Sequence, residues 1–284
     1  EVFEEISGEN LQIEFNQWIK KTGAPEIKVR NAAAHLDEKG YQLTVVLEQL
    51  QEAPAYRLDV PITVAMQGFQ KQYQTTVLMD SKRSEISLHV PSKPLRLEVD
   101  PEFDLFRRLD KNETPPALSR AFGSDEALII LPSSASEEIL HEYRKVAESW
   151  QKSPSRQMEI QLDNEINELP VDRTVWLFGK ENLFSPKIID AMKRYKVSIN
   201  DSGVSIGQSG VKRKDHSIIF TTRNPDEPDY TLVWVSTDNT AAIPGLGRKL
   251  PHYGKYSYLA FEGSEPSIVL KGRWPTVNSP MSIP

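Results

Sequence analysis

Short runs of apolar and β-branched residues follow one another through the first hundred positions, with turn residues between them. Gly40, Pro54 and Gly68 punctuate these runs. Because the gaps are too short for crossover helices, residues 23–100 are predicted to form an antiparallel β-sandwich of the immunoglobulin or fibronectin type. The six predicted strands cover residues 26–33, 42–48, 56–65, 73–79, 85–90 and 95–99.

The pattern changes near residue 125, where strand-like runs begin to alternate with helix-like ones. Residues 127–131 are continuously apolar, as in a strand that is covered on both faces. Ser133, Ser134 and Ser136 follow this run and can cap a helix that extends to about Lys152. We therefore predict an α/β domain with a mixed, mostly parallel sheet over residues 125–284. Its further strands include 158–162, 174–178, 216–222 and 230–236, with helices at 182–195 and 239–250.

Residues 101–124 lie between these two patterns and are too apolar for a free linker. We predict a joint packed between the domains, with a short helical turn that Pro115 and Pro116 end. The apolar face of this turn would consist of Phe103, Leu105, Phe106 and Leu109.

The chain opens with an amphipathic segment, predicted to be helical over residues 11–20, whose apolar face needs a partner. The first residue is Glu1 rather than Met. We expect residues 1–22 to be the end of an upstream helical domain. Any targeting segment would also lie upstream, so the sequence does not indicate the cellular compartment. The apolar face would consist of Leu11, Phe15, Trp18 and Ile19.

Composition excludes several classes of function. The net charge of −6 argues against a nucleic-acid-binding protein, because the phosphate backbone selects for an excess of Lys and Arg. The absence of cysteine excludes disulfides, thiolate metal sites and a cysteine nucleophile. No apolar run approaches the roughly 20 residues that span a bilayer, so we expect no transmembrane segment.

Several short motifs in the first hundred residues resemble the C-terminal side of an M1-family (gluzincin) zinc aminopeptidase. In that family a similar helix with an aromatic residue and a Trp ends the catalytic domain, and a β-sandwich follows. The resemblance covers residues 6–113, and residues 251–258 resemble an extra C-terminal domain of some bacterial M1-like peptidases. The matching residues are Gly8, Phe15-Asn16-Gln17-Trp18-Ile19, Gly23-Ala24-Pro25-Glu26, Tyr56, Val60-Pro61-Ile62 and Val99-Asp100-Pro101.

The resemblance implies a zinc site on an upstream catalytic domain, because the family's His-Glu-x-x-His helix, second Glu and Tyr have no counterpart here. The first hypothesis is therefore a non-catalytic C-terminal region of an M1-like zinc metallopeptidase. The sandwich would support the catalytic domain of the same polypeptide, and the α/β domain would gate peptide substrates or bind partners. The chain alone is expected to be inactive, with zinc bound only by the missing upstream domain.

Within this chain no catalytic or metal-ligating residue is predicted. The nearest pattern to a zinc helix is His141-Glu142, but Lys145 stands where the second His would be, and an ammonium group repels Zn²⁺. A hydrolase that uses Ser133 or Ser134 is a third hypothesis, although the Gly-x-Ser-x-Gly elbow is missing.

The second hypothesis is a stand-alone binding or scaffold module. Loops that follow parallel strands share the carboxyl edge of a sheet, where open α/β sheets bind small ligands. These loops supply hydroxyl, amide and carboxylate groups. The candidate ligand-binding residues are Ser133, Ser134, Asn182, Asp238 and Asn239.

Overall fold

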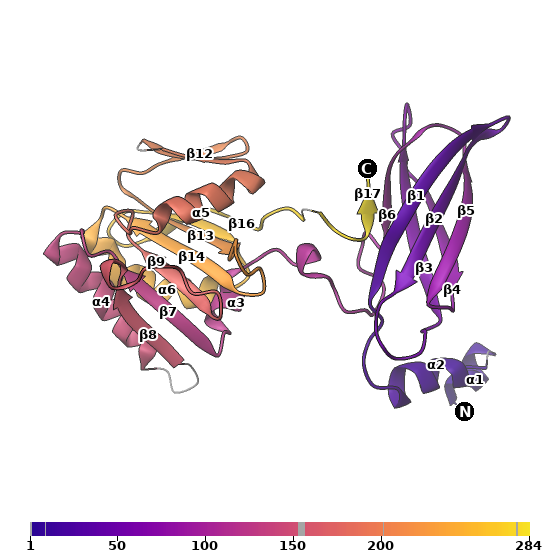
Figure 1. The fold of residues 1–284 in the computed structure, drawn as a ribbon, viewed down its shortest axis with the longest axis horizontal. Coiled ribbons are helices and arrows are strands. Elements are labelled where there is room, and N and C mark those ends of the chain that lie inside the picture. Colours follow the sequence, from indigo (N-terminus) through magenta and orange to yellow (C-terminus); the bar gives the residue numbers. More distant parts are fainter. Residues whose placement is uncertain (1, 9, 153–156, 201, 277) are drawn as a thin grey trace. The chain divides into compact units, whose positions relative to one another are not determined.

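The computed structural model describes residues 2–8, 10–152, 157–200, 202–276 and 278–284 of the chain. It divides into two compact units. Unit 1 comprises Glu1–Thr114 and Thr276–Pro284, and unit 2 comprises Pro115–Pro275. The predicted fold class is confirmed, since antiparallel sheets form the first unit and a mixed sheet with helices forms the second (Figure 1).

Unit 1 is a sandwich of two antiparallel sheets. One sheet has the strand order β1-β2-β5 and the other the order β17-β6-β3-β4. Their inner faces form one core, in which Val45 and Leu47 of one sheet and Val60, Ile62 and Val64 of the other are almost completely buried. These residues alternate with more exposed ones along each strand, as expected for sheets covered on one face. The strands are β1 (Ile27–Asp37), β2 (Gly40–Gln49), β3 (Leu58–Met66), β4 (Tyr73–Met79), β5 (Arg83–Val90), β6 (Pro94–Val99) and β17 (Ser282–Ile283).

The C-terminal tail belongs to unit 1, so its assignment to the α/β domain was wrong. β17 pairs with β6 in antiparallel register, with Ser282 opposite Glu98. The backbone N–H of Val99 also donates to the carbonyl of Met281, whose side chain is buried in the sandwich core. A strand of two residues between prolines is too short to show an alternating pattern in the sequence. Its extended conformation depends on pairing with β6.

Residues 103–109 form no helical turn, which corrects the prediction for the joint. The carboxylate of Asp100 accepts hydrogen bonds from the backbone N–H groups of Asp104 and Leu105, at 2.7 and 3.1 Å. This local side-chain contact takes the place of helical hydrogen bonds. The first helical turn of the segment is instead the 3-10 helix Lys111–Glu113. The packing of residues 101–124 between the domains stays a prediction.

The N-terminal segment is helical in three pieces. α1 (Val2–Ser7) and α2 (Gln12–Phe15) are α-helices, and a π-helix follows over Asn16–Lys20. Both α-helices lack buried residues. Such short helices have little stability by themselves, so the segment depends on contacts with the rest of unit 1.

Unit 2 is built on a seven-stranded mixed sheet with the order β16-β15-β13-β14-β9-β7-β8. β8, β7, β9 and β14 run parallel, and two successive antiparallel pairings bring β15 into the same direction, so five of the seven strands are aligned. A small separate sheet, β10-β11-β12, follows α5. The strands are β7 (Glu126–Leu131), β8 (Gln157–Leu162), β9 (Thr174–Phe178), β10 (Val197–Ile199), β11 (Gly203–Ile206), β12 (Ser209–Lys212), β13 (His216–Arg223), β14 (Thr231–Thr237), β15 (Tyr258–Glu262) and β16 (Ser267–Gly272).

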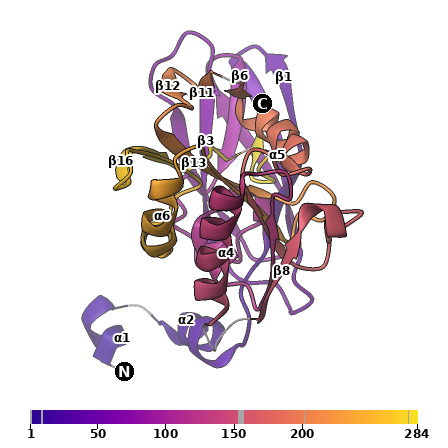
Figure 2. The same cartoon turned by 90° about the vertical axis from the view of Figure 1, so that its left-hand side faces the viewer.

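Helices cover both faces of this sheet. α4 and α6 lie side by side on one face, and α5 lies on the other (Figures 1 and 2). The predicted cap of α4 is present, because the Ser136 hydroxyl accepts a hydrogen bond from the Ile139 N–H. The helices are α3 (Leu118–Phe122), α4 (Glu137–Gln151), α5 (Ser185–Met192) and α6 (Ile243–Lys249).

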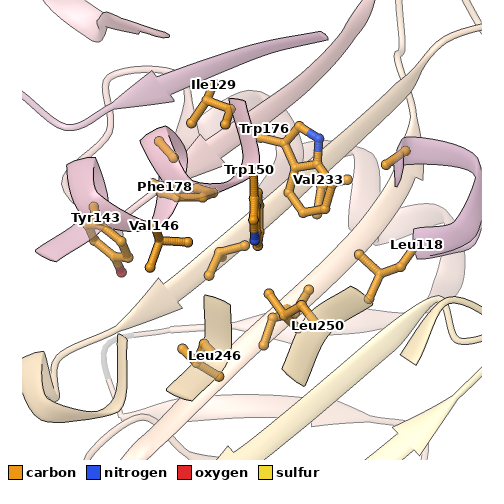
Figure 3. Packing of buried hydrophobic residues seen from close by; sticks show 14 of the residues in the cluster. Leu118, Ile129, Tyr143, Val146, Trp150, Trp176, Phe178, Val233, Leu246 and Leu250 are labelled. Atoms are coloured by element: carbon orange, nitrogen blue, oxygen red, sulfur yellow. The ribbon is translucent and has the colours of Figure 1, made fainter. Parts of the chain in front are cut away.

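A cluster of aromatic side chains fills the space between α4, α6 and the sheet. The ring of Trp150 lies 4.9 Å from that of Trp176 and 5.7 Å from that of Phe178, both in edge-to-face geometry (Figure 3). Its indole N–H donates to the carbonyl of Gly247 in α6, at 3.0 Å. This single side chain therefore ties the two helices to each other and to the sheet.

Candidate functional site

The connections in unit 2 create a topological switch point between β7 and β9. From β7 the chain passes through α4 on one face to β8, which lies on one side of β7. From β9 it passes through α5 on the opposite face, away from β7 (Figure 1). In open α/β sheets the crevice at the carboxyl ends of two such strands is the usual ligand site. Three of the candidate residues, Ser133, Ser134 and Asn182, lie in the loops after these two strands.

Asn182 is directed into the protein. Its side-chain amide donates to the carbonyl oxygens of Ile130 and Phe178, at 2.9 and 3.2 Å, and its carbonyl oxygen accepts from the Phe184 N–H at 3.1 Å. The side chain is only 2% exposed. Asn182 therefore links the ends of β7 and β9, and these contacts engage both its amide N–H groups and its oxygen.

Asp163 was not among the predicted site residues, yet it bridges the two loops at this switch point. It follows β8 directly and is completely buried. One carboxylate oxygen accepts the Ser133 N–H and the other accepts the Leu183 N–H, both at 2.9 Å. The signal was available: an acidic residue after the second strand of a βαβ unit stands where dinucleotide-binding folds place theirs.

The two predicted serines at this edge, Ser133 and Ser134, make hydrogen bonds to neighbouring segments. Ser133 contributes its backbone N–H to Asp163, and its side chain is half-buried. The exposed Ser134 donates its hydroxyl proton to the carbonyl oxygen of Glu181 at 3.4 Å. Both serines therefore connect the loop after β7 to neighbouring segments.

Asp238 and Asn239 follow β14, the next strand along the sheet. Asp238 forms an ion pair with Lys180 at 2.6 Å, and both side chains are about two-fifths exposed. The Asn239 amide donates to the hydroxyl of Ser264 at 3.2 Å. The structure therefore brings Asp238 to the loop after β9, whereas Asn239 contacts the turn after β15.

Tyr143 of α4 reaches the same edge from inside the protein. Its hydroxyl accepts a hydrogen bond from the Thr237 N–H at 3.3 Å. Burial raises the pKa of Tyr143 above its ordinary value, and the carboxylates of Glu181 and Asp238 add to the rise. The hydroxyl therefore stays protonated to a higher pH than that of an ordinary tyrosine.

No metal-binding cluster is found within the described ranges, where no three His, Asp or Glu side chains come close enough together to hold an ion. Glu142 pairs with Lys145 at 2.7 Å, as in an ordinary polar helix face. No helix in the described part of the chain is long and apolar enough to cross a membrane.

A groove of about 460 Å³ lies between α4 and α6, on the face of the sheet that these two helices cover. Its lining includes the buried residues Val146, Trp150 and Gly247 and the exposed basic residues Lys145 and Arg248. None of the predicted ligand-binding residues lines it.

Unit 1 carries an exposed apolar surface on its N-terminal segment. Ile13 is 57% exposed, Ile19 is 72% exposed and Phe106 is 70% exposed. Trp18 lies beside Phe106, since its ring meets that of Phe106 edge-on at 5.7 Å. We call Ile13, Trp18, Ile19 and Phe106 the N-terminal apolar surface.

Polar contacts fix this segment to the sandwich. The side-chain amide of Gln17 donates to the carbonyl of Arg57 at 2.9 Å and accepts the Arg57 N–H at 2.6 Å. On the next residue, the Trp18 ring stacks on Tyr56 at 5.5 Å. The amphipathic segment therefore attaches through Gln17 and Trp18, which leaves Ile13 and Ile19 facing outward.

Comparison with known proteins gave no assignment: no family model matches this chain, and no curated protein matches it.

Proposed function

We propose that this chain is the non-catalytic C-terminal region of an M1-like zinc metallopeptidase. The observation that carries the proposal is the N-terminal apolar surface, where Ile13 and Ile19 of a helical segment face outward. Exposed apolar patches on a helix mark contact sites for other protein surfaces. The partner is the upstream catalytic domain of the same polypeptide, and the sandwich holds the connecting segment in position.

The residues that carry the family resemblance support this proposal through their contacts. Gln17 and Trp18 of the helical motif meet Arg57 and Tyr56, the two residues just before β3. Segments of the motif that are about 40 residues apart thus form one structural unit. Such a unit suits a fixed joint between a helical domain and the sandwich, and the α/β unit then gates substrates or binds partners.

The chemistry of the parent protein is tested by comparing this chain with the full-length gene product. We expect zinc and hydrolysis of aminoacyl amides in the long form, with neither in this chain. A His-Glu-x-x-His helix with a downstream Glu should be encoded upstream of Glu1. Stoichiometric zinc with peptidase turnover in this chain alone would contradict the proposal.

The proposed interface is tested by placing charges on it. Ile13→Asp combined with Ile19→Asp should leave the thermal midpoint of this chain nearly unchanged, because both side chains are exposed here. The same pair in the full-length product should lower both its thermal midpoint and its activity. The matched control is Leu36→Asp on β1, an equally exposed apolar residue outside the N-terminal apolar surface. Equal effects of the control and the pair in the full-length product would refute the interface.

A further inference from the structure

Asp163 places a carboxylate where an open α/β sheet binds the anionic group of a ligand. Its two oxygens join the loop after β7, through the Ser133 N–H, to the loop after β9, through the Leu183 N–H. These are the loops on either side of the switch point, and backbone N–H groups of such loops commonly bind phosphate or carboxylate groups. One internal carboxylate thus makes the contacts that an anionic ligand would make.

We propose that the Asp163 carboxylate is an internal replacement for an anionic ligand, so that removing it uncovers a binding site for a small carboxylate anion. The proposal stands apart from the proposed function, because it concerns only the switch point of unit 2. It explains why a charged group is completely buried there with backbone amides as its hydrogen-bond partners.

The two loops around Asp163 pack closely against each other. Gly179 adopts a φ of +84°, and a Cβ atom built on it would lie 2.7 Å from the ring of Pro132, so the two loops touch. Asn182 joins the two strand ends through its bonds to Ile130, the penultimate residue of β7, and to Phe178, the last residue of β9. A freed site would therefore be small and would accept an anion about the size of the group removed.

The test is chemical rescue of Asp163→Ala, in which the deleted group is a carboxylate and formate is its closest free equivalent. We expect this variant to have a lower thermal midpoint than the wild type. Sodium formate should raise the midpoint in a saturable way and recover most of the loss, beyond the effect of sodium chloride at equal ionic strength. The wild type should respond equally to both salts.

Two controls separate charge from volume. Formamide, a neutral molecule of similar size, should not rescue Asp163→Ala. The variant Asn182→Ala removes a neutral buried group from the same switch point and should gain nothing from formate. The proposal is overturned if formate acts on Asp163→Ala no better than chloride, or if formamide rescues it equally well.

If Asp163→Ala does not fold in plain buffer, refolding from urea supplies the same answer. Recovery of native circular dichroism in formate, but not in chloride or formamide, supports the proposal. Failure in all three solutions overturns it, because an occupied anion site should restore the missing contacts. In Asp163→Gly the deleted side chain corresponds to acetate, which should then be more effective than formate.

Discussion

Arg107 and Glu113 form a buried, bidentate ion pair in unit 1. Nη1 and Nη2 of Arg107 lie 2.8 and 2.9 Å from the two carboxylate oxygens of Glu113, and Nε lies 2.7 Å from Asp100. Burial alone would lower the pKa of Arg107, but the hydrogen bonds to Glu113 and Asp100 raise it above its ordinary value. These three residues give the segment after β6 its non-helical course.

Glu113→Gln should destabilise unit 1 strongly. Removing one partner of a buried ion pair leaves the other charge undercompensated, and typical losses are about 3–5 kcal/mol of unfolding free energy. Urea unfolding followed by circular dichroism measures the change. The matched control is Glu48→Gln, which breaks ion pairs with the exposed Arg30 and Arg83 and should cost about 1 kcal/mol or less. Similar losses in both variants would contradict the role given to the buried pair.

Gly179→Ala should destabilise unit 2 for two separable reasons. The positive φ of this residue costs an L-amino acid about 1–2 kcal/mol, and the new Cβ would press against Pro132. Gly210→Ala is the control, because open space surrounds that position, and its effect should stay near zero. In the double variant Pro132→Ala/Gly179→Ala the steric cost should disappear, whereas the cost of the positive φ should remain. A complete recovery of stability would therefore exclude backbone strain.

Two tryptophans in the core of unit 2 should respond differently to the same substitution. Trp150→Phe removes indole packing and also leaves the carbonyl of Gly247 without its donor. Within the described residues the indole N–H of Trp176 has no hydrogen-bond partner, so Trp176→Phe loses packing only. We expect Trp150→Phe to cost about 1 kcal/mol more in urea unfolding. An equal or smaller cost would show that the bond to Gly247 contributes little.

Tyr143 should make the stability of unit 2 fall at high pH. Its pKa is raised by burial in the folded state, whereas the unfolded chain ionises near the ordinary value of 10.0. The contribution is therefore fully present below pH 10 and is lost as pH rises toward the folded pKa, at about 1.4 kcal/mol per pH unit. Urea unfolding between pH 9 and 11 measures this slope. Tyr143→Phe should have a shallower slope, and identical slopes would contradict the assignment.

Much of the fold was predictable because apolar runs and helix-capping residues mark many of its strands and helices in the sequence. The run at residues 127–131 corresponds to β7 (Glu126–Leu131), the run at 174–178 corresponds to β9, and Ser136 caps α4 as expected. β12 was missed, since the residues Ser209–Lys212 include only one clearly apolar side chain. Alternation and capping depend on neighbouring residues and therefore leave a signal in the sequence.

The candidate site was predicted only in part. The carboxyl edge of the sheet followed from strand and helix alternation, and Ser133, Ser134 and Asn182 do lie around one switch point. The direction of each side chain did not follow. The amide of Asn182 points inward, and the carboxylate at the centre belongs to Asp163, which lies 30 residues from its partner Ser133.

The sequence by itself determined the two kinds of layer in this protein, because the period of apolar residues decides whether a segment buries one face of a strand or one stripe of a helix. Only the tertiary structure decided which distant polar groups meet. The bonds of Gln17 to Arg57, of β17 to β6 and of Asp163 to Ser133 join segments far apart in the chain. Their partners are selected by how the layers pack, and packing over such separations leaves no local period to detect.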